Sequence, residues 1–226
     1  MIGLFEMIVP NFSRASDALW TSIVQTLQML FGSFTVSFVL GVVLGVCLVV
    51  MRRGGILENP VLYRIVDKVI DTIRSVPFLI LIVLLFPLSR LIVGTAIGVM
   101  GAIVPLVIGT VPFFSRQVET AVSEVDHGLI EASVAMGLSP IQIIFRVYLR
   151  ESIPALTRVT QITAINVLHL VTLAGAVGAG GLGDFAIRFG HQQGLRDLMW
   201  LTIVIILVMV SIIQIVGNIV IKKTTH

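Results

Sequence analysis

The sequence predicts an all-α, polytopic membrane protein that forms a single domain over residues 1–226. Hydrophobic residues make up 57% of the chain and charged residues only 12%. That charged share is about half of what soluble domains usually carry. The charges are also gathered between long apolar stretches. Lipid is therefore the expected surrounding of most of the chain, and no nucleic-acid partner is expected.

Five membrane spans are expected, because a transmembrane helix needs about 20 mostly apolar residues. Four stretches free of Asp, Glu, Lys and Arg reach this length, and they begin at Trp20, Leu91, Val159 and Leu198. A shorter charge-free stretch, 75–89, reaches it only if its helix starts near Val69. The expected spans are about 20–51, 69–89, 92–116, 155–178 and 198–221.

The distribution of Lys and Arg predicts the orientation, since cytoplasmic loops carry an excess of them. With the C-terminus in the cytoplasm, eleven of the 15 lie on that side. The four on the outer side are Arg14, Arg90, Arg188 and Arg196. The N-terminus is therefore expected outside, and the segment 123–153 in the cytoplasm. Residues 1–19 lack the pattern of a cleavable signal peptide, so an interfacial or loosely ordered lead-in is expected.

Small and polar residues inside the spans are expected to serve helix packing. Gly41 and Gly45 are four residues apart, as are Gly94 and Gly98, and this spacing lets helices approach closely. We favour packing within the chain over a contact with another subunit. The same interpretation is preferred for three polar residues near the outer end of the first span, which are Gln25, Thr26 and Gln28.

The longest polar segment is predicted to contain two short helices. The first begins near Asp126, a favourable N-cap, and ends at Gly137, where glycine accepts a left-handed conformation. The second begins at Ser139, with Pro140 at the first helical position and Gln142 completing a capping box. Its apolar face is expected to carry Ile141, Ile144, Phe145 and Tyr148.

Such a helix–elbow–helix segment can lie on the membrane surface or dock in a groove of a partner protein. From the physical pattern alone, we favour a plain interfacial loop.

The segment also resembles the "EAA" loop of permease subunits of binding-protein-dependent ABC importers. That motif reads EAA, three residues, G, nine residues, I, one residue, and LP. Glu131-Ala132-Ser133 and Gly137 fit its first part. Val147 and Leu149 fall near the later hydrophobic positions, and Arg150 replaces the proline. The resemblance implies coupling helices that sit in a cleft of a separate ATPase, with the small Ala132 and Ser133 permitting close approach. The implied coupling residues are Glu131, Ala132, Ser133, Gly137, Ser139 and Pro140.

Residues 155–178 form the most polar expected span. Threonine hydroxyls can bond to their own helix backbone, so the threonines here need no special role. Asn166 and His169 need partners inside a membrane. For His169 we favour a hydrogen bond between helices over a place on a substrate pathway. The candidates for the pathway or its gate are Asn166, His169, Thr172 and Leu173.

A glycine run follows this span. Gly178, Gly180 and Gly183 have the spacing of a dinucleotide-binding fingerprint, but that fingerprint requires a preceding strand in a βαβ unit. At the outer end of a membrane helix, the run instead predicts a tight turn. The residues of this structural turn are Gly178, Gly180, Gly181 and Gly183.

Two runs resemble the methionine-uptake, or MetI-like, branch of these permeases. They are GAVGAGGLGDFAIRFG at 175–190 and IRSVPFLILIVLLFPLSRLIVGTAIG at 73–98, and the resemblance extends over essentially the whole chain. The branch has approximately GYSAMAG before the glycine run, where this chain has HLVTLAG. Leu173 thus takes the place of a methionine that lies near the outer gate in this family.

The resemblance implies a permease of an ABC importer in a bacterial cell membrane, carrying methionine (D or L) or a close analogue. It implies a homodimer in the lipid bilayer, two ABC ATPase subunits that use ATP and Mg, and an extracytoplasmic substrate-binding protein. The chain itself is expected to be no enzyme and to bind no cofactor or metal. It lacks the phosphate-loop motif Gly-x4-Gly-Lys-Ser/Thr.

Two other function classes fit less well. An ion-coupled secondary transporter or channel usually has ionisable groups inside its spans, and only His169 is available. An intramembrane enzyme needs a nucleophile with a positioned base, or metal ligands. The histidines at 127, 169, 191 and 226 show no ligand spacing.

Overall fold

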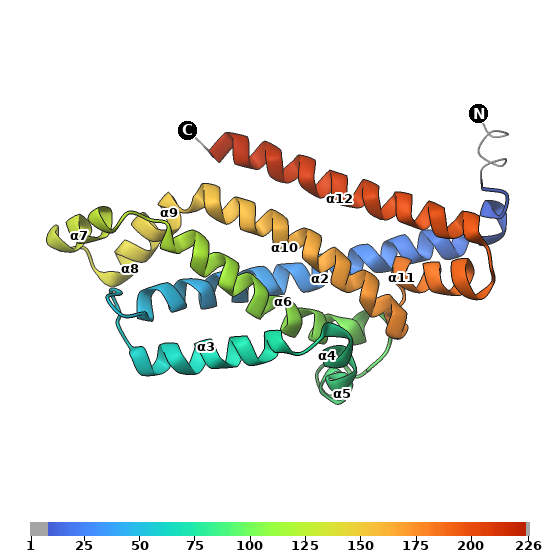
Figure 1. The fold of residues 1–226 in the computed structure, drawn as a ribbon, viewed down its shortest axis with the longest axis horizontal. Helices are drawn as coiled ribbons and strands as arrows, with labels where there is room; N and C mark the ends of the chain where they lie inside the picture. The colour runs from blue at the N-terminus through green and yellow to red at the C-terminus, as the bar shows by residue number, and fades with distance from the viewer. Residues whose placement is uncertain (1–8, 225–226) are drawn as a thin grey trace. The chain divides into compact units, whose positions relative to one another are not determined.

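The computed structural model describes residues 9–224, and this part of the chain folds into helices without strands (Figure 1). The all-α class expected from the sequence is therefore confirmed. The expectations for residues 1–8 lie outside the described residues. The α-helices are α2 (Phe12–Met51), α3 (Pro60–Ser75), α4 (Phe78–Leu84), α5 (Phe86–Val93), α6 (Gly98–Ser123), α7 (His127–Ala135), α8 (Pro140–Ile143), α9 (Leu149–Glu151), α10 (Ile153–Ala174), α11 (Gly181–Phe185) and α12 (Arg196–Thr224). Three π-helical segments are η1 (Ile144–Tyr148), η2 (Gly175–Ala179) and η3 (Ala186–Gln192).

Four of the described helical stretches are long and apolar enough to cross a membrane. They are Phe12–Met51, Gly98–Ser123, Ile153–Ala179 and Arg196–Thr224. They correspond to the first, third, fourth and fifth expected spans. The third begins later than the expected residue 92, because the chain first completes α5 and passes through Gly94, whose φ is 79°.

The expectation of a loosely ordered lead-in is wrong from Phe12 onward, where α2 has already begun. Asn11 donates hydrogen bonds from its backbone and side chain to the Asp197 carboxylate, at 3.0–3.1 Å. Ala15 and Leu19 are buried in the first turns of the helix. Burial and these hydrogen bonds to α12 together hold this early segment as helix.

The second expected span, 69–89, is not one continuous helix. α3 ends at Ser75, and Val76 and Pro77 are extended, with ψ of 124° and 133°. Proline has no N–H for the helical ladder and disfavours helical geometry in the residue before it, which explains the break. A second break, at Leu85, precedes α5, which carries Pro87 in its first turn. The apolar residues 69–89 are thus divided among three helices.

The described residues group into two compact units, and every boundary except that between Val76 and Pro77 lies within a long helix. Unit 1 contains the chain up to Thr35, Pro77–Val107 and Ala164–Gln214. Unit 2 contains Val36–Val76, Ile108–Thr163 and the chain from Ile215. Each unit has a hydrophobic core of its own.

The core of unit 1 joins the N-terminal half of α2 to parts of α4, α6 and α10. Met29, Ile82, Leu106 and Leu168 are fully or almost fully buried within it. A second cluster, built by Leu19, Leu182, Phe185 and Leu198, ties α2 to α11 and the start of α12. These clusters provide the framework on which the glycine run is fixed.

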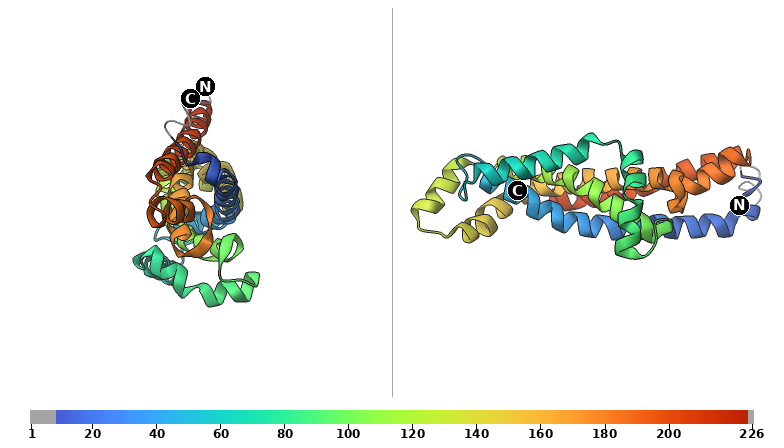
Figure 2. Two further views of the ribbon diagram at one scale, coloured as in Figure 1. Left: turned by 90° about the vertical axis from the view of Figure 1, so that its right-hand side faces the viewer. Right: turned by 90° about the horizontal axis from the view of Figure 1, so that it is seen from below.

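The core of unit 2 depends on a close approach of α2 to α6. A Cβ added at Gly41 would lie 2.5 Å from Phe114 Cδ1, and one added at Gly45 would lie 2.5 Å from Val118 Cβ. Packing within the chain is therefore confirmed for this glycine pair. For Gly94 and Gly98 the expected helix packing is wrong, because a Cβ added at either would meet no atom within 4 Å. Both have positive φ, Gly94 at the end of α5 and Gly98 as the first residue of α6. In the views of Figures 1 and 2, α3 runs beside the unit 2 part of α6, where hydrogen bonds connect them.

Candidate functional site

The polar segment forms the predicted pair of short helices around a glycine, and we call residues 126–151 the elbow. The Asp126 carboxylate accepts a hydrogen bond from the N–H two residues later, at 2.7 Å, and caps α7. Gly137 has a φ of 76°, and a Cβ added there would meet no atom within 4 Å. Ser139 precedes Pro140 and caps α8, while Gln142 Oε1 accepts the Ser139 N–H at 2.9 Å. Both predicted caps and the predicted left-handed glycine at Gly137 are confirmed.

The apolar face predicted for the second helix is partly wrong. Tyr148 is buried and Ile144 half-buried, but Ile141 and Phe145 are 68% and 66% exposed. Ile143, outside the predicted set, is 1% exposed. The cause is η1, because the hydrogen bonds of a π-helix span five residues instead of the four of an α-helix, and this wider turn brings Ile143 and Tyr148 to one side.

The coupling candidates divide between the surface and the interior of unit 2. Glu131 and Ala132 are exposed, and the Glu131 carboxylate has no ion-pair partner among residues 9–224. Ser133 is buried, and its hydroxyl donates to the Leu129 carbonyl at 2.7 Å. Its small side chain therefore serves packing inside the unit. A set of exposed apolar side chains, the elbow patch, comprises Leu129, Val134, Met136, Ile141 and Phe145.

The elbow is anchored firmly despite this exposed patch. Ile130, Ile143 and Tyr148 are buried in the same cluster as Phe114 and Val118 of α6. Burial raises the pKa of the Tyr148 phenol, which keeps it neutral at physiological pH. The elbow therefore packs directly against α6 within unit 2.

A charge cluster on unit 2 went unnoticed in the sequence. The Arg116 guanidinium donates to Asp67, to Asp71 at 3.0 Å and to Glu119 at 2.7 Å, and the Tyr63 hydroxyl donates to Glu119 at 3.3 Å. The available signal was the i, i+4 spacing of the two aspartates on one face of amphipathic α3. The cluster fixes α3 to α6.

Three of the four pathway candidates share one face of α10 in unit 1. At about 100° per residue, Asn166, His169 and Leu173 fall within roughly 60° of one another. His169 is exposed, Leu173 is 43% exposed and Asn166 is half-buried. Thr172 lies to the side of this face, and its hydroxyl donates to the Leu168 carbonyl at 2.9 Å. Thr172 therefore satisfies its own hydroxyl, as expected for threonines in this helix.

The glycine run forms a tight reversal, which we call the glycine turn (residues 175–183). Val177 and Gly178 leave helical geometry, and Gly180 has φ 82° and ψ −161°, a conformation open essentially only to glycine. Gln25 Oε1 accepts the Gly181 N–H at 2.8 Å. The Thr26 hydroxyl accepts the N–H of the next residue, Leu182, at 2.9 Å.

The packing role expected for Gln25 and Thr26 is thus confirmed, and their partners are backbone groups far along the chain. Gln28 is exposed and takes no part in these hydrogen bonds. The structural turn predicted from the glycines is present. Sequence reasoning missed only the identity of its anchors, because a hydrogen bond between residues 156 positions apart has no local pattern.

Over residues 37–225, the sequence matches the family described as the binding-protein-dependent transport system inner membrane component. The chain belongs to this permease family. The permease is 43% identical over 222 residues to the probable D-methionine transport system permease protein MetI of Vibrio cholerae, covering 98% of this chain and 99% of the relative. It is 40% identical over 217 residues to the methionine import system permease protein MetP of Bacillus subtilis, covering 96% and 97%.

A solved chain of the MetNI methionine ABC transporter, in an inward-facing conformation, is similar along almost its whole length. The TM-score is 0.92 and the identity 40%, covering 94% of the permease and 99% of that chain. The resemblance to MetI-like proteins is therefore confirmed. The chain is a membrane transport subunit rather than an enzyme, because its relatives are permease subunits.

Proposed function

We propose that this permease forms the translocation path of an ABC importer for methionine, in D or L form, or a close analogue. The observation that carries the proposal is the nearly full-length similarity to the D-methionine permease of Vibrio cholerae. The relative from Bacillus subtilis, named for methionine import, supports the same cargo.

The proposed assembly is a homodimer in a bacterial inner membrane, with two ATPase subunits and an extracytoplasmic binding protein. ATP and Mg are used by the ATPases, because the permease sequence has no phosphate loop. Each copy crosses the membrane five times with its N-terminus outside. The second crossing is supplied by the broken series α3, α4 and α5. The eleven-to-four distribution of Lys and Arg supports this orientation.

In this proposal the elbow is the segment that binds in a cleft of the ATPase. Docked helices commonly use exposed apolar anchors, and Met136, Ile141 and Phe145 of the elbow patch are available for this. Glu131 offers an unpaired carboxylate to a basic group of the partner. Ala132 allows close approach, while Ser133, Gly137, Ser139 and Pro140 keep the elbow in shape.

ATP binding brings the two ATPases together and draws the two elbows with them. Because Ile143 and Tyr148 pack against α6, the motion enters the bundle through that helix. The permease then shifts between inward-facing and outward-facing states, each favoured by a different state of the nucleotide site. The face of α10 with Asn166 and His169 lines the path, and Leu173 closes its outer end.

Reconstitution with purified partners tests the proposal. Proteoliposomes that contain the permease, its ATPase and its binding protein should take up radiolabelled methionine only with ATP and Mg. The matched control omits the ATPase. Uptake without the ATPase, driven by an ion gradient, would instead identify a secondary transporter.

A further inference from the structure

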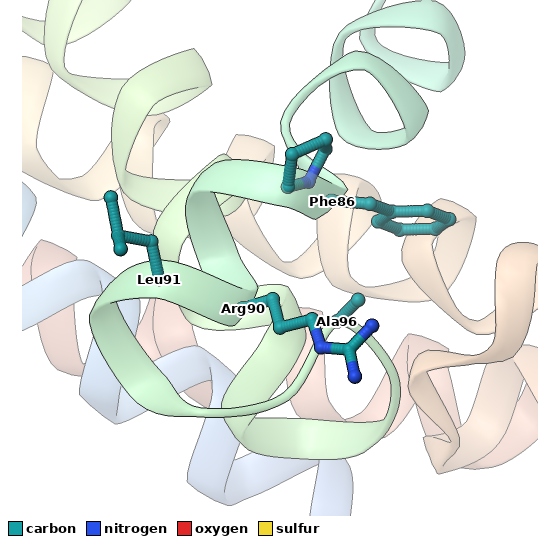
Figure 3. Close-up of a pocket in the computed structure, with 5 residues that line it drawn as sticks. Phe86, Arg90, Leu91 and Ala96 are labelled. Carbon is teal, nitrogen blue, oxygen red and sulfur yellow. The ribbon is translucent and has the colours of Figure 1, made fainter.

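A pocket of about 550 Å³ lies beside the short helix α5 in unit 1 (Figure 3). Its lining residues are Phe86, Pro87, Arg90, Leu91 and Ala96. Four of these belong to α5, and the fifth belongs to the loop that leads to α6. Its volume falls within the roughly 300–1,000 Å³ usual for small-molecule sites.

The backbone around the pocket is well defined. α5 is closed by the left-handed Gly94, whose N–H donates to the Arg90 carbonyl at 3.1 Å. The Thr95 hydroxyl donates to the Ile97 carbonyl at 3.0 Å and accepts the Ile97 N–H at 3.2 Å. These hydrogen bonds span Ala96 and hold it beside α5. The pocket is therefore formed before any ligand arrives.

Arg90 supplies the charge of this pocket. Phe86 and Arg90 are one helical turn apart and extend to the same side of α5, with the Arg90 side chain passing beside Ala96 (Figure 3). The guanidinium has no hydrogen-bond or ion-pair partner among residues 9–224. Arg116 and Arg188, by contrast, are both paired with carboxylates.

These surroundings select a particular chemistry. A guanidinium offers a planar pair of donors that matches a carboxylate. The other lining side chains are apolar, and a thioether packs favourably against the edge of an aromatic ring such as that of Phe86. No acidic side chain lines the pocket, so an ammonium group gains nothing there and stays in water on the open side.

We propose that this Arg90 pocket is a receiving site on the outer side of the permease for the carboxylate of an apolar amino acid. A methionine released by the binding protein rests there, with its carboxylate on Arg90 and its side chain on Phe86, before it enters the path. The inference rests on the proposed function for the cargo and for the direction of transport.

Photolabelling tests the pocket directly. The complete complex, in nanodiscs of zwitterionic phospholipid, is irradiated with a diazirine analogue of methionine, and labelled peptides are identified by mass spectrometry. The segment 86–96 should be labelled. Arg90→Gln should lower this labelling about fivefold, the upper end of what an exposed ion pair contributes. Arg90→Lys should retain part of it, since the charge remains but the paired donors are lost.

Controls separate the carboxylate from other causes of labelling. Arg14→Gln removes another exposed arginine of unit 1 and should leave labelling unchanged. Excess methionine and N-acetylmethionine should compete with the probe, whereas methionine methyl ester should not, because it has no carboxylate. Labelling should also persist when anionic phospholipid is added to the nanodiscs.

Several results would overturn the inference. These are undiminished labelling in Arg90→Gln, equal competition by the methyl ester, and loss of labelling with anionic lipid, which would indicate a phosphate headgroup site. Absence of labelling in the wild-type complex would show that the pocket is covered by another chain. ATP-dependent import is measured on the same preparations. If import is intact but the Arg90 variants are labelled like the wild type, only the pocket is rejected. If the wild-type complex imports no methionine, the proposed function itself is rejected.

Discussion

The elbow and the glycine turn are both tight reversals built on left-handed glycines, but they are held in opposite ways. In the elbow, the capping hydrogen bonds join residues two or three positions apart, as between Ser139 and Gln142. In the glycine turn, they come from Gln25 and Thr26, 156 positions earlier in the chain. One reversal is a local structure, and the other exists only when α2 is in place.

The two regions also differ in what they leave exposed. The elbow presents Met136, Ile141 and Phe145 to the surroundings, whereas Leu182 in the glycine turn and Phe185 just after it are fully buried. The glycine turn is completed within the chain, and the elbow is left open for a partner. We therefore expect changes in the glycine turn to act on folding, and changes on the surface of the elbow to act on assembly.

The largest effect is expected from Gly183→Ala. A Cβ at this position would lie 2.0 Å from the Thr172 carbonyl oxygen, so backbone must move. We expect a loss of about 3 kcal/mol in stability, measured by thermal unfolding in detergent. Gly137→Ala is the matched control in the elbow, where only the left-handed backbone is strained, at about 1–2 kcal/mol. Equal losses for the two variants would contradict the contrast between the regions.

Removal of the long-range anchors should have the next largest effect. Thr26→Val leaves the buried Leu182 N–H without an acceptor, which should cost about 1–3 kcal/mol. Gln25→Ala should act in the same way on Gly181. Hydrogen exchange at these two amides should accelerate in the respective variants. The control is Gln28→Ala, on the same helix but exposed, and a similar loss there would show that the hydrogen bonds are not the cause.

Glu131→Lys tests the elbow as an assembly surface. Reversing this exposed charge should weaken ATPase binding about tenfold, or about 1.4 kcal/mol, while thermal unfolding of the isolated permease stays unchanged. Binding can be measured by titrating the labelled ATPase into reconstituted permease. Glu58→Lys, a charge reversal at another exposed position of unit 2, is the control. Wild-type affinity in Glu131→Lys would remove this residue from the coupling site.

Ser139→Ala addresses the local hydrogen bonds of the elbow. Loss of the N-cap should cost about 1 kcal/mol or less, since the cap is exposed to water. Hydrogen exchange should accelerate in residues 141–144 and remain unchanged in the glycine turn. Faster exchange in both regions would mean that the two reversals are coupled.

The smallest effect on stability is expected from Leu173→Ala, because the side chain is exposed and a surface change usually stays within about 0.5 kcal/mol. Its effect should appear in transport, as passive leak of methionine through the outer constriction. Flux from loaded proteoliposomes without ATP measures this leak. If the variant leaks no more methionine than the wild type and its ATPase coupling is normal, Leu173 is not a gate.

The same contrast explains how much of the molecule could be predicted. The caps at Asp126 and Ser139 are short-range features, so the sequence was sufficient to locate both elbow helices. The buried side of the second helix was missed, because the π-helix η1 changes the helical repeat, so that Ile143 is buried and Ile141 is exposed. Propensity and spacing carry no signal for such a shift.

Among the spans, hydropathy located the four long helices but not the division of 69–89. Pro77 was visible in the sequence, yet its neighbours are so apolar that length and hydropathy favoured one helix. The anchors Gln25 and Thr26 could be assigned to packing, but not to Gly181 and Leu182. Long-range pairing depends on the packed bundle, which the local pattern does not encode.

The Arg116 cluster has a consequence for mutational tolerance. Three carboxylates share one guanidinium, those of Asp67 and Asp71 from α3 and that of Glu119 from α6. If any one of the acids is replaced, two remain to hold the arginine, and α3 stays joined to α6 through the others or through Tyr63. If Arg116 is lost, three acids, two of them partly buried, face one another without their counter-charge, which is far more costly. Each of the three acids can thus be replaced singly, whereas Arg116 cannot, because all three acids depend on its charge.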